Sequence, residues 1–208
     1  EQRFPFLGSK VFTIYPGIVE EKRREEVRSW IGLIGRLDPI KGQGDFVEVA
    51  RIVHSQFPQI EFVLAGKEEN VKEEDLRKKV QGYGLEKSFR FLGYVKDPKE
   101  VMLRCVIGVI ASRGSEAISR VLLEWMSCGK VVVATRVGCI PEIVEDGVTG
   151  FLVSPGDVKE MAKCISVLLQ NPLKAKKMGE EARRRIQTRF SMERFIKETE
   201  RVYQETIR

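Results

Sequence analysis

The chain has 208 residues, of which 42% are hydrophobic and 32% charged, and its formal net charge is +6. This length and composition suffice for one large or two small globular domains with a hydrophobic core. No run of about 18 uncharged apolar residues occurs, so the sequence predicts no membrane-spanning helix.

Residues 1–29 are predicted to be a linker or interdomain segment. Phe12-Thr13-Ile14-Tyr15 has strand character, but Pro16-Gly17 interrupts it and residues 20–26 are dense in charge. The start, Glu1-Gln2, lacks a methionine and the basic and apolar parts of a signal peptide. We therefore expect these residues to belong to a longer chain.

From Trp30 onward, short apolar runs alternate with stretches of helical period. The apolar runs predict strands at residues 31–35, 60–65, 89–92, 106–111, 131–135 and 150–153. The periodic stretches predict helices at residues 44–56, 71–81, 98–104, 116–124, 157–170, 172–188 and 191–206. Strands without polar alternation are buried on both faces, and regular alternation with helices makes the sheet parallel. We predict a doubly wound, Rossmann-like α/β domain over residues 30–190, followed by a C-terminal helix within residues 191–208.

The cysteines and the single histidine do not have the spacing of metal ligands. No Cys-x-x-Cys pair occurs among Cys105, Cys128, Cys139 and Cys164, and His54 stands alone. No metal site and no cofactor are expected. Small buried thiols in a reduced, cytoplasmic protein are favoured over a disulfide.

Residues 172–190 carry seven Lys or Arg against two Glu. Such a stretch can contact anionic lipid, as a peripheral membrane protein does, or nucleic acid. Solvated faces of two surface helices are the favoured alternative. Because no aromatic residue is interleaved with these charges, we expect no nucleic-acid partner.

Two carboxylates, Glu116 and Glu124, stand eight positions apart after the predicted strand 106–111. In a helix that spacing is a rise of roughly 12 Å and about 80° of rotation, so both can reach one extended ligand. The backbone N–H groups that follow Glu116 would be free donors at a helix start, where diphosphates bind. The alternative is an amphipathic helix with two solvated glutamates.

Four motifs occur in order along the chain. They are Gly35-Arg36-Leu37-Asp38-Pro39-Ile40-Lys41-Gly42, Phe91-Leu92-Gly93, the paired glutamates with Cys128-Gly129, and Pro141-Glu142-Ile143-Val144-Glu145-Asp146-Gly147-Val148-Thr149-Gly150. Together they resemble the C-terminal half of retaining glycosyltransferases of the GT-B fold, family 4. The match runs from about Tyr15 to Tyr203, which is nearly the whole chain.

The resemblance implies a role for each matching residue. Arg36 and Lys41 would hold the donor diphosphate and stabilise its negative charge as the glycosidic bond breaks, which makes them catalytic together with Glu116. Glu124 would bind the ribose, and Glu116 a hydroxyl of the transferred sugar near its cationic centre. The loop Gly93-Tyr94-Val95 would face the nucleobase. The backbone of Ala117, Ile118 and Ser119 would complete the donor site.

The physical reading of Arg36 and Lys41 agrees with this. Both follow the first predicted strand, so both cations are expected at the carboxyl end of the sheet, where Arg and Lys suit a diphosphate. The chain departs from the family pattern at three positions. Ala117 stands where Gly is usual, Trp125 where Ala is usual, and Val131 where Pro is common.

The predicted function is the donor-binding domain of a retaining glycosyltransferase, which transfers a sugar from a nucleotide-sugar to a carbohydrate or lipid-linked acceptor. By resemblance, an N-terminal GT-B domain is absent and residues 191–208 would cross back to it, so the fragment is expected to be inactive alone. The alternative is a non-catalytic, nucleotide-sugar-binding or regulatory module. A GT-B epimerase or phosphorylase ranks third.

Overall fold

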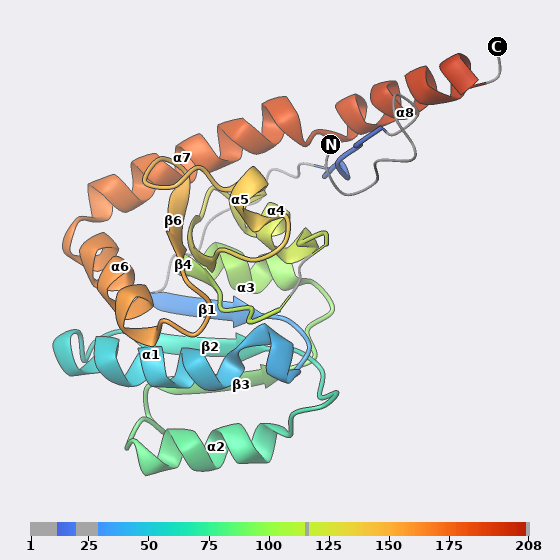
Figure 1. Ribbon diagram of the computed structural model, residues 1–208. Coiled ribbons are helices and arrows are strands. Elements are labelled where there is room, and N and C mark those ends of the chain that lie inside the picture. Colours follow the sequence, from blue (N-terminus) through green and yellow to red (C-terminus); the bar gives the residue numbers. More distant parts are fainter. Residues whose placement is uncertain (1–11, 20–28, 115–116, 207–208) are drawn as a thin grey trace.

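The computed structural model describes residues 12–19, 29–114 and 117–206. Within them, six parallel strands form one sheet in the order β3-β2-β1-β4-β5-β6 (Figure 1). The strands are β1 (Trp30–Ile34), β2 (Glu61–Ala65), β3 (Phe89–Gly93), β4 (Cys105–Ile110), β5 (Val131–Thr135) and β6 (Gly150–Val153). The order places β1 beside β4, although two strands and three α-helices lie between them in the chain.

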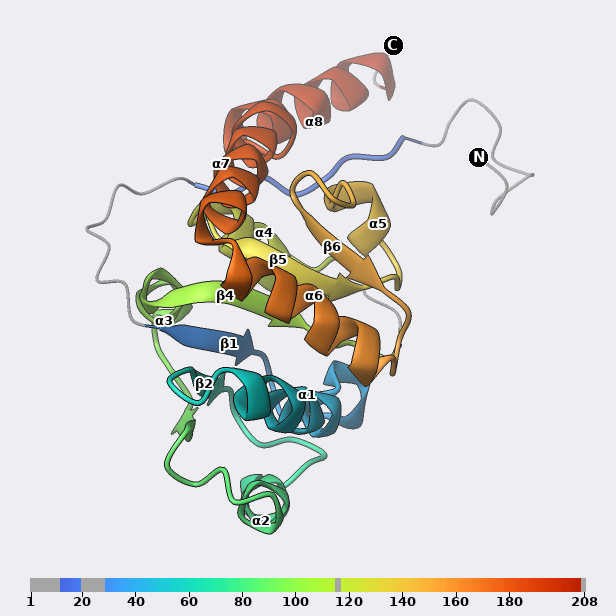
Figure 2. The ribbon, with the colours of Figure 1, turned by 90° about the vertical axis from the view of Figure 1, so that its left-hand side faces the viewer.

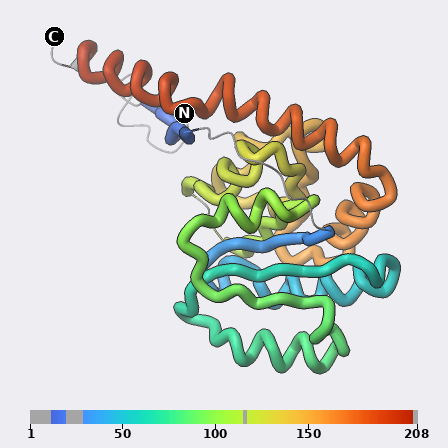
Figure 3. Tube along the Cα trace, turned by 180° about the vertical axis from the view of Figure 1, so that it is seen from behind, coloured from blue at the N-terminus to red at the C-terminus, as the bar shows by residue number. Residues whose placement is uncertain are grey.

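The helices cover both faces of the sheet. One face carries α1 (Gln43–Gln56) and α6 (Val158–Gln170), with α2 (Glu73–Gly82) beside α1. The opposite face, seen from behind in Figure 3, carries α3 (Pro98–Arg104), α4 (Arg120–Ser127) and α5 (Ile140–Ile143). The long helix α7 (Pro172–Arg189) contacts both α6 and α4. The last helix is α8 (Met192–Thr206).

Both faces of the strands are apolar because each faces a separate core. Ile31 and Leu33 of β1 pack with α1 and α6, whereas Trp30 and Ile34 of the same strand pack with α3 and α4. This burial explains the absence of polar alternation. The prediction of a doubly wound α/β fold is confirmed.

The predicted elements differ from the observed ones mainly at their ends. Each predicted strand is present, with bounds shifted by one residue at most. Asp157 and Ser191 mark helix starts as predicted, because their side chains accept hydrogen bonds from Glu160 N at 3.0 Å and Arg194 N at 3.2 Å. Two short helices were not predicted, α5 and the 3₁₀ turn η2 (Pro39–Lys41). Both contain a proline in the first turn. The predicted helix at residues 116–124 begins later, as the site geometry explains below.

Residues 12–19 form no strand and pack where α7 passes into α8 (Figure 2). The Ile18 amide donates to the Phe190 carbonyl at 3.0 Å, and the rings of Tyr15 and Phe190 meet edge to face at 5.4 Å. Lys99 Nζ of α3 also donates to the Val19 carbonyl at 3.3 Å, so residues 12–19 are attached to the domain at more than one place. The boundaries 1–29, 30–190 and 191–208 stay predictions. None of the described helices is long and apolar enough to cross a membrane.

Candidate functional site

The carboxyl ends of β1 and β4 form the topological switch point of the sheet. These strands are neighbours, but the helices that follow them, α1 and α4, lie on opposite faces. The loops after the two strands therefore diverge, and open α/β sheets bind their ligands in the crevice left between them. The described residues predicted for donor binding belong to these two loops, to the loop after β3 and, for Glu124, to α4.

The loop after β1 and the loop after β4 touch. The Arg113 amide donates to the Ile40 carbonyl at 2.8 Å, and the Arg113 guanidinium pairs with Asp45 of α1 through Nε and Oδ2 at 2.6 Å. Gly42 has a φ of 69°, and a Cβ there would overlap the Ala111 carbonyl. Only glycine allows this close approach. The contact holds the two loops against each other.

The loop after β1 is held by hydrogen bonds from its own side chains. Asp38 caps η2 by accepting from Ile40 N at 2.9 Å, and it accepts from Asn70 Nδ2 at 2.7 Å. These two bonds favour the charged carboxylate and lower the pKa of Asp38. Gln43 Nε2 donates to the Arg36 carbonyl at 2.7 Å. The backbone that carries Arg36 and Lys41 is thus tied at both ends.

Arg36 lies on the surface at this edge, as predicted, and its guanidinium is paired. Nη1 lies 3.1 Å from both carboxylate oxygens of Glu69, in the loop after β2, and the arginine side chain is 52% exposed. Lys41 ends η2 and is half-buried. An exposed ion pair of this kind contributes only about 0–1 kcal/mol, so an anionic ligand can replace Glu69 at low cost.

The loop after β3 joins the same edge through glycines. Gly93, with a φ of 58°, accepts from the Gly66 amide at 2.8 Å, and a Cβ on Gly66 would overlap the Gly35 carbonyl. The loops after β1, β2 and β3 are therefore stacked backbone to backbone. Tyr94 is 74% exposed and Val95 is half-buried. Gly93, Tyr94 and Val95 thus lie beside the Arg36 loop.

The start of α4 corrects the prediction of a helix from Glu116. Glu116 itself lies outside the described residues, while Ala117 and Ile118 precede the helix and are exposed. Ser119 is the N-cap, since its carbonyl accepts from Leu122 N and Leu123 N at 3.1 and 3.2 Å. Serine is a favoured residue directly before a helix, although the Ser119 hydroxyl makes no capping hydrogen bond here. The helical estimate of the Glu116 to Glu124 spacing therefore does not apply.

Two features at this end of α4 concern a ligand. The Ser119 hydroxyl is buried and has no hydrogen-bond partner among the described residues. Glu124 is mostly buried, with its side chain 16% exposed, and accepts from Arg120 Nε at 3.0 Å. Among the described residues no non-glycine residue has a positive φ, so Ala117 is accommodated without backbone strain.

Trp125, where the family pattern has alanine, is seated on two glycines. Gly32 of β1 and Gly108 of β4 are paired in the sheet, and a Cβ on them would lie 2.9 Å and 2.5 Å from carbons of the Trp125 indole. Trp125 is fully buried. The two glycines leave the room that the larger side chain needs, so α4 and its neighbouring residue Glu124 are anchored to the β1–β4 pair.

The motif at residues 141–150 packs as a support in the described structure. Ile140 is fully buried, Glu142 accepts a hydrogen bond from the Tyr15 hydroxyl, and Arg185 Nε donates to the Ile143 carbonyl at 2.7 Å. The Glu142 bond and burial raise the pKa of Tyr15. The sequence left open whether this region lines the cleft or supports it. These contacts join it to the linker and to α7.

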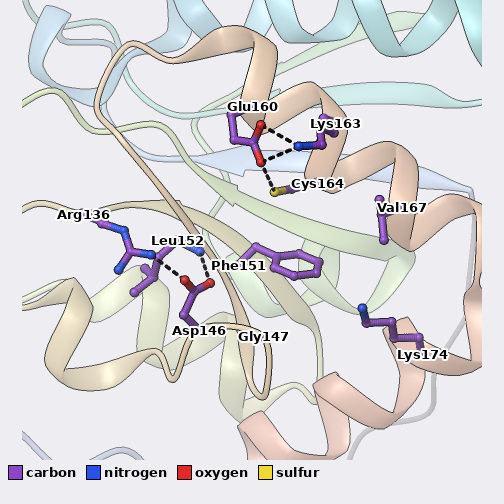
Figure 4. Close-up of a pocket in the computed structure, with 10 residues that line it drawn as sticks. All are labelled: Arg136, Asp146, Gly147, Phe151, Leu152, Glu160, Lys163, Cys164, Val167 and Lys174. Carbon is purple, nitrogen blue, oxygen red and sulfur yellow. Dashed lines mark hydrogen bonds and ion pairs between the residues drawn. The ribbon is translucent and has the colours of Figure 1, made fainter.

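A surface hollow of about 600 Å³ lies between β6, α6 and the start of α7 (Figure 4). Arg136 pairs with Asp146, and Lys163 Nζ pairs with Glu160 at 3.1 Å. None of the described residues predicted for donor binding lines this hollow. Among the described residues, no cluster of three or more His, Cys, Asp or Glu is placed to hold a metal ion.

Comparison with known proteins decides the family. The family model described as Glycosyl transferases group 1 matches residues 18–185. The chain belongs to this family. Over 173 residues it is 30% identical to alpha-D-kanosaminyltransferase of Streptomyces kanamyceticus, covering 78% of this chain and 44% of that enzyme. It is 32% identical over 129 residues to N-acetyl-alpha-D-glucosaminyl L-malate synthase of Bacillus anthracis, covering 62% and 34%.

Solved structures of the family agree with the fold. Anabaena HepE in complex with UDP and glucose aligns with a TM-score of 0.76 and 29% identity, over 85% of this chain and 47% of that one. The isolated C-terminal domain of a group 1 glycosyl transferase, LpcC from Francisella tularensis, aligns with a TM-score of 0.74 and 25% identity, over 86% and 96%. The resemblance to the C-terminal half of a GT-B glycosyltransferase is confirmed. The chain spans between 14% and 60% of the length of the curated relatives it matches.

Proposed function

We propose that this chain is the donor-binding half of a retaining glycosyltransferase, with its nucleotide-sugar in the crevice between the loops after β1 and β4. The contact of these two loops carries the proposal. In the proposed arrangement the Arg36–Lys41 loop lies on one side of the crevice and α4, which contains Glu124, lies on the other; the Ile40–Arg113 hydrogen bond between the loops supports this arrangement. A diphosphate between them would meet two cations and the first amides of a helix.

In this proposal the residues divide the donor between them. Arg36 exchanges Glu69 for a phosphate oxygen, and Lys41 adds a second charge, so that both stabilise the leaving diphosphate. Glu124 accepts from the ribose hydroxyls. Glu116 holds the transferred sugar, and retention of configuration follows the family pattern. Donor charge is held by these side chains, without a metal.

The nucleotide is proposed from a neighbour. HepE was solved with UDP-glucose at 29% identity, so a uridine nucleotide is the first donor to test. The acceptor, a carbohydrate or a lipid-linked glycan, belongs in this proposal to the N-terminal GT-B domain that α8 would cross to. The isolated chain should therefore bind nucleoside diphosphate without transferring sugar, because half of the groups that orient the acceptor are missing.

Calorimetric titration with UDP, GDP and ADP tests the proposal. Arg36→Ala and Lys41→Ala should each weaken binding of the preferred nucleotide by about 1.5–3 kcal/mol, the range for a hydrogen bond to a charged group. Arg184→Ala is the matched control, because Arg184 is also an exposed arginine paired with a glutamate, at 2.6 Å from Glu181, but lies on α7. Wild-type affinity in both crevice variants at low salt would refute the diphosphate assignment.

The proposed roles of Glu124 and Glu116 are distinguished by the ligands whose binding each substitution should weaken. Glu124→Gln should weaken UDP and UDP-sugar alike by about 1–3 kcal/mol, since both contain the ribose. Glu116→Gln should leave UDP binding nearly unchanged and lower turnover in the two-domain enzyme. Glu198→Gln is the control, because Glu198 accepts from Arg194 at 2.7 Å in the same i,i+4 geometry as Glu124. Equal small effects of all three substitutions would refute the assigned roles.

A further inference from the structure

A cavity of about 540 Å³ opens at the amino edge of the sheet, opposite the candidate site. Its walls come from the residues before β1 and β2, from the first residues of β4 and β5, and from the junction of α6 and α7. Figure 1 has this junction at the left, where the strands begin, and Figure 2 turns that side toward the viewer. The volume falls within the range of small-molecule pockets, about 300–1,000 Å³.

The walls of this cavity are mainly apolar. Aliphatic side chains from both layers line it, among them Val106, Val131, Leu168 and Leu169, and Ser29 is the one hydroxyl-bearing residue of the lining. A sugar or nucleotide would bury hydroxyls here without partners, at a cost of roughly 1–3 kcal/mol each. An alkyl chain has no such groups and is the chemistry that these walls accept.

The charged residues of the lining are mostly cationic. Lys176 and Arg183 of α7 and Lys130 before β5 contribute three positive charges against the single carboxylate of Glu180. Lys176 is exposed and forms no ion pair with a described residue. In the hollow of Figure 4, by contrast, Arg136 and Lys163 are each paired with an acid. The third cation of that hollow, Lys174, has its Nζ 5.2 Å from the centroid of the Phe151 ring. Lys176 has neither an ion-pair partner nor an aromatic ring beside it among the described residues.

We propose that the amino-edge cavity binds an anionic amphiphile, an alkyl chain ending in a carboxylate or phosphate. The alkyl chain would lie against the aliphatic walls, and the anionic group would lie beside Lys176 and Arg183. The same chemistry is presented by a free fatty acid and by a lipid of a membrane surface. This site is separate from the proposed donor crevice, since none of the described residues proposed to bind the donor lines the cavity.

The first experiment measures binding of monomeric decanoate to the full chain by calorimetry. Decanol supplies the same alkyl chain without charge, and butyrate supplies the charge with a short chain. Decanoate should bind at least about tenfold more tightly than either, because it alone uses both parts of the site. Equal binding of decanol and decanoate overturns the proposal. So does the absence of decanoate binding.

The second experiment compares two neighbouring lysines. Lys176→Glu should weaken decanoate binding about tenfold, whereas Lys177→Glu, an identical charge change on an exposed residue outside the lining, should leave it unchanged. Equal effects would mean general attraction to a basic helix and overturn the proposal. Phosphatidylglycerol vesicles separate the sources: binding to vesicles that depends on Lys176 supports uptake from a membrane. Binding to vesicles without binding of monomeric decanoate contradicts the proposal that the cavity binds the amphiphile.

The cysteines give an internal readout without substitution. Cys128 lines the cavity and Cys139 does not, and both are partly exposed. Decanoate should slow alkylation of Cys128 by iodoacetamide several-fold and leave Cys139 unaffected, as measured by peptide mass spectrometry. Equal slowing of both thiols, or no slowing of Cys128 at saturating decanoate, contradicts binding in the cavity.

Discussion

The packing of Trp125 against Gly108 predicts that substitutions at these two positions, one in β4 and one in α4, have strongly coupled effects on stability. A Cβ on Gly108 would lie 2.5 Å from Cδ2 of the indole and 2.9 Å from Cγ and Cε3. Carbon atoms pack at about 3.5–4.0 Å, so Gly108→Ala must displace a fully buried indole by about 1 Å. Overpacking of that kind costs about 1–3 kcal/mol.

The substitution also removes a glycine from a strand, which stabilises by about 0.5–1 kcal/mol. We therefore expect Gly108→Ala to lower the free energy of unfolding by about 1–2 kcal/mol in the wild-type background. Trp125→Leu alone should cost about 2–4 kcal/mol, somewhat less than truncation to alanine. In that background the clash is gone, so Gly108→Ala should be neutral or stabilising. The coupling energy is then about 2 kcal/mol.

Urea unfolding followed by far-ultraviolet circular dichroism measures all four proteins of this cycle, because the signal does not depend on the tryptophan that is removed. Gly82→Ala is the control, since a Cβ there would meet nothing within 4 Å. A coupling energy below about 0.5 kcal/mol would refute the packing argument. Gly108→Ala should also weaken nucleoside diphosphate binding, because the displaced helix contains Glu124.

Three further outcomes are expected. Gly42→Ala should lower the free energy of unfolding by more than about 2 kcal/mol, because it combines a left-handed φ with overlap of the Ala111 carbonyl. Gly84→Ala is the control for the φ contribution alone, since Gly84 has a φ of 67° and a Cβ there would meet nothing within 4 Å. An equal loss of stability in both variants contradicts the loop contact. Asp38→Ala should lower stability at neutral pH, and the difference from wild type should shrink as acid protonates Asp38 below its ordinary pKa of 3.8, so a difference that persists unchanged at about pH 2 contradicts the hydrogen-bonded carboxylate. Burial raises the pKa of Cys105 from 9.0 to about 12, so its contribution to stability is present below about pH 9 and is lost as pH rises toward 12. Urea midpoints should therefore fall less steeply with alkaline pH in Cys105→Ala than in wild type, and identical slopes contradict the shift.

The local elements of this protein were predictable because their signals are local. Short apolar runs without polar alternation predicted the buried strands, and side-chain oxygens at Asp157 and Ser191 marked two helix starts. The positions of Arg36 and Lys41 after β1 followed from the same pattern. The start of α4 at Ser119 also has a local signal, a serine directly before an apolar run.

Only the tertiary structure decided what lies beside what. The strand order places β1 next to β4, so that Ile40 and Arg113 share a hydrogen bond although 73 positions separate them in the chain. Segments distant in sequence also meet at three other places: where Trp125 packs against Gly32 and Gly108, where Arg36 pairs with Glu69, and around the cavity at the amino edge. Periodicity records which face of an element is buried, but the identity of its neighbour depends on packing between elements, which no local pattern encodes.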